Sequence, residues 1–517
     1  MAIGEVRSDD KGIERQAKAG TDTMQWTVTQ AADALGVRAP SGLDPMARLA
    51  GVSIDSRTLG AGELFIAIHG PRHDGHAFIG AAFAAGAGAG LVARARLQEY
   101  PAEIQGTLFA VDDPLAALQR LASYACDRWR KAKQGRLVGA VAGSVGKTTT
   151  KEILAALVAA RFRVLKTQGN LNNEYGLPLT LLKLDDEYDA AIVELGMSHT
   201  GELANLTKIA SPDVGVITRV AVEHLEFFAS LDEIALAERE LIENLPWPRA
   251  TAVLNADDER VARFADVARG NVVTFGARPA ADFRAENIED RGLEGSSFDF
   301  VSRNSRTRLN LPLIGRHNVM NALGALAGAS AWDIRAADAQ KVFTSLKAAD
   351  KRGEVVRFED GFTIINDSYN SSPSALAAMI ELLAATPGYK RRILAAGEML
   401  ELGESSADLH RECGRAAAEQ RHLDWIIGVR GHAAEFVRAA IDAGHPKDRT
   451  RYFENSDDAA QFLKTFIVPA DLLLLKGSRG VRMEKILEAI DAEHSRVNRR
   501  DATVAQDSVS VDRKGRR

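Results

Sequence analysis

The 517-residue chain has only two cysteines, Cys126 and Cys413, so no disulfide framework is expected and the reducing cytoplasm fits. No run of about 18 uninterrupted apolar residues occurs, so we expect no membrane span. The polar N-terminus lacks the apolar segment of a signal peptide. A net charge of −5 argues against a protein built to coat nucleic acid, and we expect no nucleic-acid partner.

The rest of the composition is that of a globular protein with more than one hydrophobic core. Apolar residues make up 46% of the chain and charged residues 26%, and a chain of this length exceeds what one core supports. Both ends are polar and without an apolar period, so we expect disordered tails over 1–25 and 495–517. Between them we expect three domains, over 26–112, 113–349 and 350–494.

The second and third of these blocks alternate short apolar segments with helical patterns. This alternation is typical of βαβ units and of mainly parallel sheets, whose ligands bind at the carboxyl ends of the strands. We predict an α/β protein with a small α/β first domain, a central mainly parallel P-loop ATPase sheet and a Rossmann-like C-terminal domain. The predicted strands are Leu137–Ala142, Ala190–Glu194, Val214–Thr218, Thr251–Asn255, Thr363–Ile365, Arg392–Ala396, Trp425–Val429 and Asp471–Leu475.

A glycine-rich segment follows the first of these strands and precedes a helix with an apolar face. The backbone N–H groups of such a loop face an anion, Lys147 adds a positive charge, and Thr148 offers a hydroxyl to Mg²⁺. A glycine-rich turn with a chance lysine is the alternative, but the flanking strand and helix favour a phosphate cradle. The predicted nucleotide-binding residues here are Ala142, Gly143, Ser144, Val145, Gly146, Lys147, Thr148 and Thr149.

Two carboxylates and one imidazole follow at places where metal ligands are expected. Glu194 ends a strand beside the phosphate loop, and His224 follows the next strand. Either one could instead be a solvated or structural side chain. Glu238 lies on the apolar face of a predicted helix. Burying its carboxylate there would cost several kcal/mol unless the carboxylate meets a cation. The alternative is that Glu238 lies at the edge of this face and its carboxylate reaches water. The apolar residues of that face are Leu231, Ile234, Leu241 and Leu245.

Taken together, these residues resemble the Mur ligases, the ATP-dependent amide-bond ligases of peptidoglycan precursor synthesis. The resemblance covers residues 26 to about 490 and rests on an ordered set of motifs, each of which is weak alone. The motifs are Ser53–Thr58 and Asp74–His76 in the first block, Gly143–Thr150, Asn170–Asn173, Glu194–Met197, His224–Glu226, Asn255–Asp258 and His317–Asn321 in the second, and Asp367–Asn370, Gly397–Gly403 and Lys476–Arg479 in the third.

The resemblance implies a UDP-sugar site in the first block, ATP and Mg²⁺ as cofactors, and an acyl-phosphate intermediate. The motifs of the third block match the family member that joins D-alanyl-D-alanine to UDP-N-acetylmuramoyl-tripeptide, so these are the expected substrates. The implied residues are Lys147, Glu194, His224, Glu238 and Arg352 for catalysis, Asn318 for adenine, Asp367 for ribose, Thr148, Glu194, His224 and Glu238 for Mg²⁺, and Ser53, Asp55, Ser56, Arg57, Asn172, Asn173, Tyr369 and Asn370 for substrate.

Several positions depart from the residues that are usual in the family. Ala142 stands in place of threonine, Arg219 in place of asparagine, Asn366 in place of aspartate and Lys351 in place of a linker glycine. Glu238 occupies the place of the family's lysine, which is carbamylated to form an anionic metal ligand. A glutamate restores the negative charge without carbon dioxide, on a shorter side chain.

Other interpretations stay open at this point. One is a related ligase with a different amine acceptor, although the Asp-Asn-Pro-Arg motif of the diamino-acid-adding member is absent from the third block. Folate-type ligases lack the Asp-Ser-Arg segment that is present at 55–57. The third interpretation is a nucleotide-binding relative without enzymatic activity. The argument against it is that the expected site residues are intact: Lys147, Thr148, Glu194 and His224. We expect a monomer.

Overall fold

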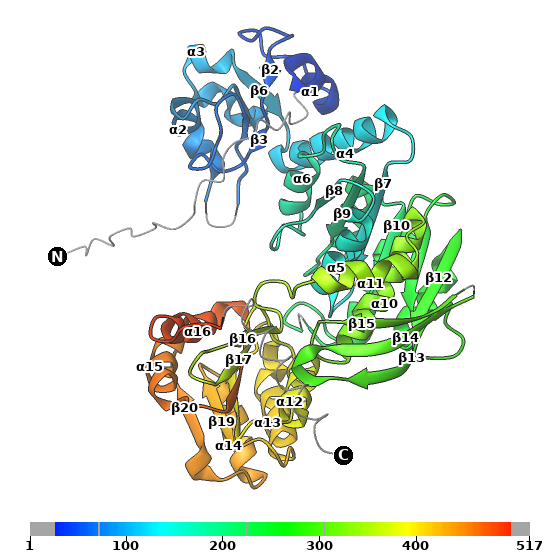
Figure 1. Cartoon of the computed structure of the whole chain (residues 1–517). Coiled ribbons are helices and arrows are strands. Elements are labelled where there is room, and N and C mark those ends of the chain that lie inside the picture. The colour runs from blue at the N-terminus through cyan, green and yellow to red at the C-terminus, as the bar shows by residue number, and fades with distance from the viewer. Residues whose placement is uncertain (1–25, 71–72, 224, 304, 498–517) are drawn as a thin grey trace, which may run out of the picture. The chain divides into compact units, whose positions relative to one another are not determined.

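The computed structural model describes residues 26–70, 73–223, 225–303 and 305–497. His224 and the expected tail over 1–25 lie outside these residues, as does 498–517. Contacts divide the chain into two units: the first runs to residue 121 and includes 182–186, and the second contains the remainder (Figure 1). None of the helices in the described residues is long and apolar enough to cross a membrane.

The first unit is built on a small parallel sheet in the order β3-β4-β5-β6. Its core contains Phe65, Ile79, Val92 and Leu108. A capping box at Thr27 starts its first helix, because the Thr27 hydroxyl accepts from the N–H of Gln30. The elements are β1 (Trp26–Thr27), α1 (Val28–Leu35), β2 (Arg48–Leu49), β3 (Val52–Ser53), β4 (Leu64–Ile66), α2 (Ile79–Ala84), β5 (Ala89–Ala93), α3 (Ala102–Gln105) and β6 (Leu108–Val111), followed by α4 (Pro114–Ala132).

The second unit contains a nine-stranded sheet in the order β15-β14-β13-β12-β11-β10-β7-β9-β8. The strands from β8 across to β13 pair in parallel, and β13, β14 and β15 form an antiparallel meander. The strands are β7 (Leu137–Ala142), β8 (Val164–Lys166), β9 (Ala190–Glu194), β10 (Val214–Ile217), β11 (Thr251–Asn255), β12 (Asn271–Gly276), β13 (Phe283–Asp290), β14 (Ser296–Ser302) and β15 (Ser305–Leu311).

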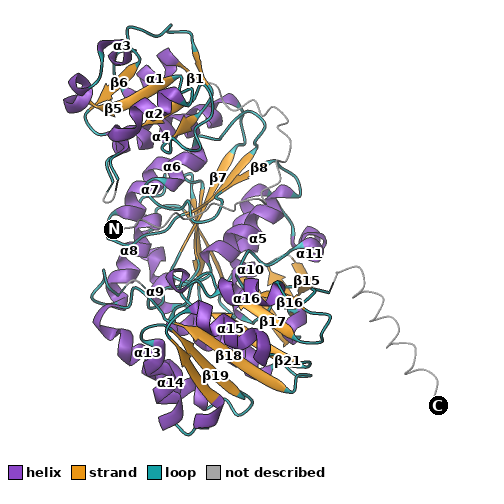
Figure 2. Ribbon diagram, turned by 90° about the vertical axis from the view of Figure 1, so that its left-hand side faces the viewer, coloured by secondary structure: helices purple, strands orange, loops and turns teal. Residues whose placement is uncertain are grey.

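Helices cover both faces of this sheet, which explains why its central strands are apolar along their whole length. Figure 2 shows α5 and α10 on one face and α7 and α8 on the other. The helices are α5 (Lys147–Ala159), α6 (Gly176–Leu181), α7 (Glu202–Ala210), α8 (Leu231–Glu243), α9 (Glu259–Ala262), α10 (His317–Ala329) and α11 (Ala336–Ser345).

The C-terminal part has its own six-stranded sheet in the order β16-β17-β21-β18-β19-β20, parallel except for β16. Alternate residues of β21 enter opposite cores: Leu472 and Leu474 pack into one, and Leu473 and Leu475 into the other. The elements are β16 (Glu354–Arg357), β17 (Thr363–Asp367), α12 (Pro373–Ala385), β18 (Arg391–Gly397), α13 (Ser406–Ala418), β19 (Trp425–Val429), α14 (Ala433–Asp442), β20 (Thr450–Phe453), α15 (Ser456–Phe466), β21 (Asp471–Lys476) and α16 (Glu484–Asp491).

The predicted α/β class is confirmed, and every predicted strand is present with ends that differ by at most two residues. The antiparallel meander of β13, β14 and β15 was not predicted, because these strands carry polar side chains along one face. Ordered chain also extends past the expected boundary at 494: the N–H of Val497 donates to the Arg357 carbonyl at 2.8 Å.

Candidate active site

The phosphate loop lies between the end of β7 and the start of α5. Neither of its two glycines can be replaced by a residue with a side chain without strain or a steric clash. Gly143 and Gly146 have φ values of 118° and 94°, in the region that favours glycine. A Cβ on Gly143 would collide with Thr218, and one on Gly146 with the Asn321 side chain. The N–H of Ser144 also donates to a carbonyl beyond β10, that of Arg219, at 2.7 Å. The loop is therefore clamped between the end of β10 and α10.

Lys147, the first residue of α5, faces an excess of negative charge. Its Nζ lies 3.2 Å from Glu223 Oε1 and donates to the Ser144 carbonyl at 3.2 Å. Burial lowers the pKa of Lys147, but the carboxylates of Glu223, Glu238 and Glu194 offset this effect, so the pKa lies above its ordinary value. Lys147 is therefore a cation at neutral pH, surrounded by three carboxylates.

Glu194 ends β9, which pairs with β7, so its carboxylate comes to the same sheet edge as the phosphate loop. Its side chain is buried, and Oε1 accepts from Asn172 Nδ2 at 2.9 Å. Glu194 Oε2 is also buried, and among the described residues it has no hydrogen-bond partner. A buried carboxylate oxygen without a donor is costly, and a bound cation would remove that cost.

Glu238 is buried on α8, with 1% of its surface exposed. Ile234 and Leu241, on the same helix face, are buried as well. The alternative that Glu238 reaches water from the edge of the apolar face is therefore wrong. Its charge contributes to the raised pKa of Lys147, which places the carboxylate near the phosphate loop.

The oxygen atoms around the phosphate loop suit a metal ion that is coordinated only in part by the protein. Within the described residues, no group of three His, Cys, Asp or Glu side chains could hold a metal ion alone. Mg²⁺ is usually bound through one or two carboxylates, with water and substrate phosphates completing its octahedron. The buried Glu194 and Glu238 and the half-buried Thr148 match that donor set.

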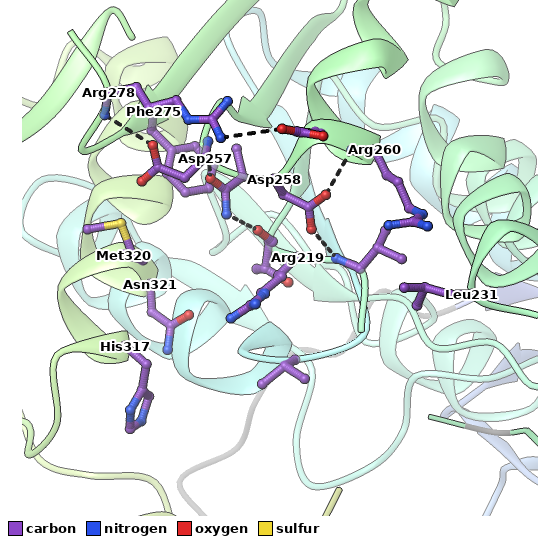
Figure 3. A pocket seen from close by; sticks show the side chains of 15 residues that line it. Arg219, Leu231, Asp257, Asp258, Arg260, Phe275, Arg278, His317, Met320 and Asn321 are labelled. Carbon is purple, nitrogen blue, oxygen red and sulfur yellow. Dashed lines mark hydrogen bonds and ion pairs between the residues drawn. The ribbon is translucent and has the colours of Figure 1, made fainter. Parts of the chain in front are cut away.

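A cavity of about 550 Å³ opens beside the phosphate loop, a size that suits a nucleoside. Its polar walls are built into the domain: Asn255 Nδ2 donates to the Thr218 carbonyl, and Asp258 caps α9. Figure 3 shows side chains of α10 facing the strand ends across it. The lining residues are Val145, Thr218, Arg219, Val220, Leu231, Asn255, Asp257, Asp258, Glu259, Arg260, Phe275, Arg278, His317, Met320 and Asn321.

The side chain of Asn318 is engaged inside the protein. Its Nδ2 donates to the Ile314 carbonyl at 2.8 Å, and its Oδ1 accepts from Asn321 Nδ2 at 2.8 Å. The α10 residues that line the cavity are His317, Met320 and Asn321. Their i, i+3, i+4 spacing places them on one helix face. This spacing is a signal in the sequence from which the three cavity-lining residues could have been predicted. Burial lowers the pKa of His317, which favours the neutral imidazole.

The site residues predicted for the third block come together around the end of β17. The buried Lys476 Nζ lies 2.6 Å from Asp367 Oδ2 and donates to the Asn370 carbonyl at 2.9 Å. The Arg352 guanidinium stacks 4.2 Å from the centre of the Tyr369 ring. This cluster presents charged and aromatic groups at the carboxyl ends of β17 and β21.

The residues predicted for the first block occupy one turn after β3. Arg57 holds Asp55 through two side-chain bonds, at 2.9 and 2.7 Å, and these bonds lower the pKa of Asp55 to about 2. The Ser53 hydroxyl accepts from the N–H of Asp55 at 3.2 Å, and Ser56 lies half-buried within the turn. Ser53, Asp55, Ser56 and Arg57 are therefore neighbours in one polar turn.

A phosphate loop, a charged lysine among carboxylates and a nucleoside-sized cavity define a nucleotide-dependent α/β enzyme. The chain belongs to the Mur ligase family, whose members are ATP-dependent, ADP-forming ligases. Residues 48–125 match the model of the Mur ligase family, catalytic domain, residues 141–329 that of the Mur ligase middle domain, and residues 351–479 that of the Mur ligase, glutamate ligase domain.

Relatives match over most of their length. The UDP-N-acetylmuramoyl-tripeptide--D-alanyl-D-alanine ligase of Bacillus subtilis is 34% identical over 438 residues, which are 85% of this chain and 92% of that protein. The enzyme of the same name from Escherichia coli is 34% identical over 85% of this chain and 93% of its own. The crystal structure of MurF from Acinetobacter baumannii is similar with a TM-score of 0.80 and 28% identity, covering 92% of this chain and all of that one. MurF ligase from Thermotoga maritima, solved in complex with ADP, has a TM-score of 0.72 and 29% identity, covering 86% of this chain and 97% of that one.

Proposed function

We propose that this enzyme joins D-alanyl-D-alanine to the free carboxylate of UDP-N-acetylmuramoyl-tripeptide, converting ATP to ADP and phosphate. The observation that carries the proposal is the extent of the similarity: relatives of that name match through all three predicted domains, over about 85% of the chain. ATP and UDP-linked sugars are cytoplasmic metabolites, so the proposed reaction belongs to the cytoplasm.

In the proposed reaction, an oxygen of the tripeptide carboxylate attacks the γ-phosphorus of ATP and ADP leaves, which gives an acyl phosphate. The dipeptide amine then attacks the acyl carbon, loses a proton and expels phosphate as the amide forms. The main requirement is neutralisation of crowded anions. Lys147 and the N–H groups of the loop provide this at the nucleotide phosphates.

Mg²⁺ completes the proposed site and would supply further positive charge at the phosphates. Thr148, Glu194 and Glu238 are the described residues that would hold it, and His224 remains a predicted ligand. Asn172 keeps Glu194 oriented through its 2.9 Å hydrogen bond. The Asn173 Oδ1 accepts from the N–H of Gly176 at the start of α6, and we assign Asn173 with Asn172 to substrate binding.

The substrate contacts divide among the domains. We assign the UDP sugar to the turn that contains Ser53, Asp55, Ser56 and Arg57, and the ribose and phosphate to Asp367 and Arg352. Tyr369 and Asn370 are assigned to the incoming dipeptide. The unusual Asn366 is buried and bonds with Glu354 and Ser368 inside the domain, so it gives no support for a different acceptor.

The acceptor is tested by phosphate release with ATP, Mg²⁺ and UDP-N-acetylmuramoyl-tripeptide in the presence of different amines. We expect rapid release with D-alanyl-D-alanine, little with D-alanine or a diamino acid, and none without the tripeptide. A faster rate with another amine would assign the chain to a relative with a different acceptor. Release that is independent of the tripeptide would contradict the proposed function.

A further inference from the structure

Among the described residues, one arginine that lines the nucleotide cavity, Arg219, has a side chain without a hydrogen-bond or ion-pair partner. Three arginines line this cavity, and two of them are paired with acids: Arg260 Nε lies 2.8 Å from Asp232, and Arg278 lies 3.8 Å from Glu259. The exposed side chain of Arg219 forms no hydrogen bond or ion pair within the described parts of the chain. Figure 3 shows it extending into the cavity, with no interaction drawn to it.

The backbone of Arg219 is fixed against the phosphate loop. Its carbonyl accepts from the N–H of Ser144 at 2.7 Å, and its N–H would lie 3.0 Å from a Cβ on Gly143. The base of the side chain is therefore held beside the loop, while none of the described residues engages the guanidinium, which can meet a ligand. An arginine placed in this way loses little backbone freedom when it binds.

The charge around the loop indicates which part of a nucleotide it would meet. Lys147 faces three carboxylates, from Glu223, Glu238 and Glu194, so the protein side chains here are anionic in sum. A polyphosphate that binds at this loop needs more positive charge than one lysine gives. A guanidinium matches phosphate oxygens with two parallel N–H donors.

We propose that Arg219 is a phosphate-binding residue of the nucleotide site, whose guanidinium contacts the phosphate chain of bound ATP or ADP. The inference rests on the nucleotide site of the proposed function and adds a binding residue to it. Stacking of the guanidinium on the purine is the competing assignment, and it predicts a different ligand dependence.

The test is equilibrium binding of ADP and of adenosine to the full-length protein, measured by calorimetry or by displacement of a fluorescent ADP analogue. Arg219→Met removes the charge and keeps most of the length. Arg263→Met is the matched control, because Arg263 is exposed on another segment of the same domain and does not line the cavity. Arg219→Lys keeps the charge without the planar fork.

We expect Arg219→Met to weaken ADP binding roughly ten- to a hundredfold, the loss expected for a hydrogen bond to a charged group. Adenosine binding should be unchanged, Arg219→Lys should recover part of the loss, and Arg263→Met should bind ADP like the parent. Equal ADP affinity in the two methionine variants would overturn the proposal, as would an equal loss for ADP and adenosine, which indicates stacking on the base. If the parent itself does not bind ADP, the nucleotide site of the proposed function is wrong as well.

Discussion

Lys147→Ala is expected to abolish ATP turnover while the protein remains folded. The lysine is a cation that interacts with three carboxylates at the phosphate loop, so its removal takes away positive charge beside Glu223, Glu238 and Glu194. A triphosphate would then be repelled from the loop. Loss of a preorganised electrostatic contact of this kind costs about a hundred- to a thousandfold in rate.

Lys208→Ala is the matched control for this variant, because Lys208 is exposed on α7 and its removal changes the net charge equally. ADP formation should be measured beside thermal unfolding for both variants. Lys147→Arg keeps the charge at the loop and serves as a second variant if the alanine protein unfolds. Turnover by Lys147→Ala within a few-fold of the parent would refute the phosphate-loop assignment.

The second large effect is expected at Glu238. A glutamate carries its negative charge at once, whereas the carbamylated lysine of the family needs carbon dioxide. We therefore expect activity to be unchanged when bicarbonate and carbon dioxide are removed from the assay. Glu238→Gln keeps the shape and removes the charge, so we expect turnover to fall at least about tenfold and the magnesium requirement to rise.

Glu243→Gln on the same helix is the control, because Glu243 is exposed and pairs with Arg239 at 2.8 Å. The measurement is a magnesium titration of the initial rate for the parent and both glutamine variants. If Glu238→Gln gives the same rate and the same magnesium dependence as the parent, Glu238 does not take part in the metal site.

The predictable parts of this fold are those where local pattern and tertiary burial agree. The central strands are apolar throughout because helices cover both faces, so β7, β9 and β11 could be predicted with correct ends. In β13, charged residues such as Arg284 and Glu286 face away from the core, and the apolar signal is weak. The meander was therefore not predictable from apolar runs alone.

The candidate site likewise has features that the sequence predicts and features that it cannot predict. Helical spacing alone predicts that Glu238 points inward, and its burial agrees. Spacing cannot show that Glu223, 76 positions after Lys147, pairs with it. Nor can it show that Arg219 alone among the cavity's arginines has no acidic partner within the described residues. These facts depend on strand order, which brings the end of β10 beside β7.

The central claim is that the chain activates a peptide carboxylate as an acyl phosphate and passes it to an amine. The most direct test uses UDP-N-acetylmuramoyl-tripeptide whose terminal carboxylate is labelled with ¹⁸O, together with ATP, Mg²⁺ and D-alanyl-D-alanine. Mass spectrometry of the released phosphate and of the peptide product is the readout. The account predicts one ¹⁸O atom in each phosphate released and an amide product that retains the other. Unlabelled phosphate, or phosphate release without the amide product, would contradict it.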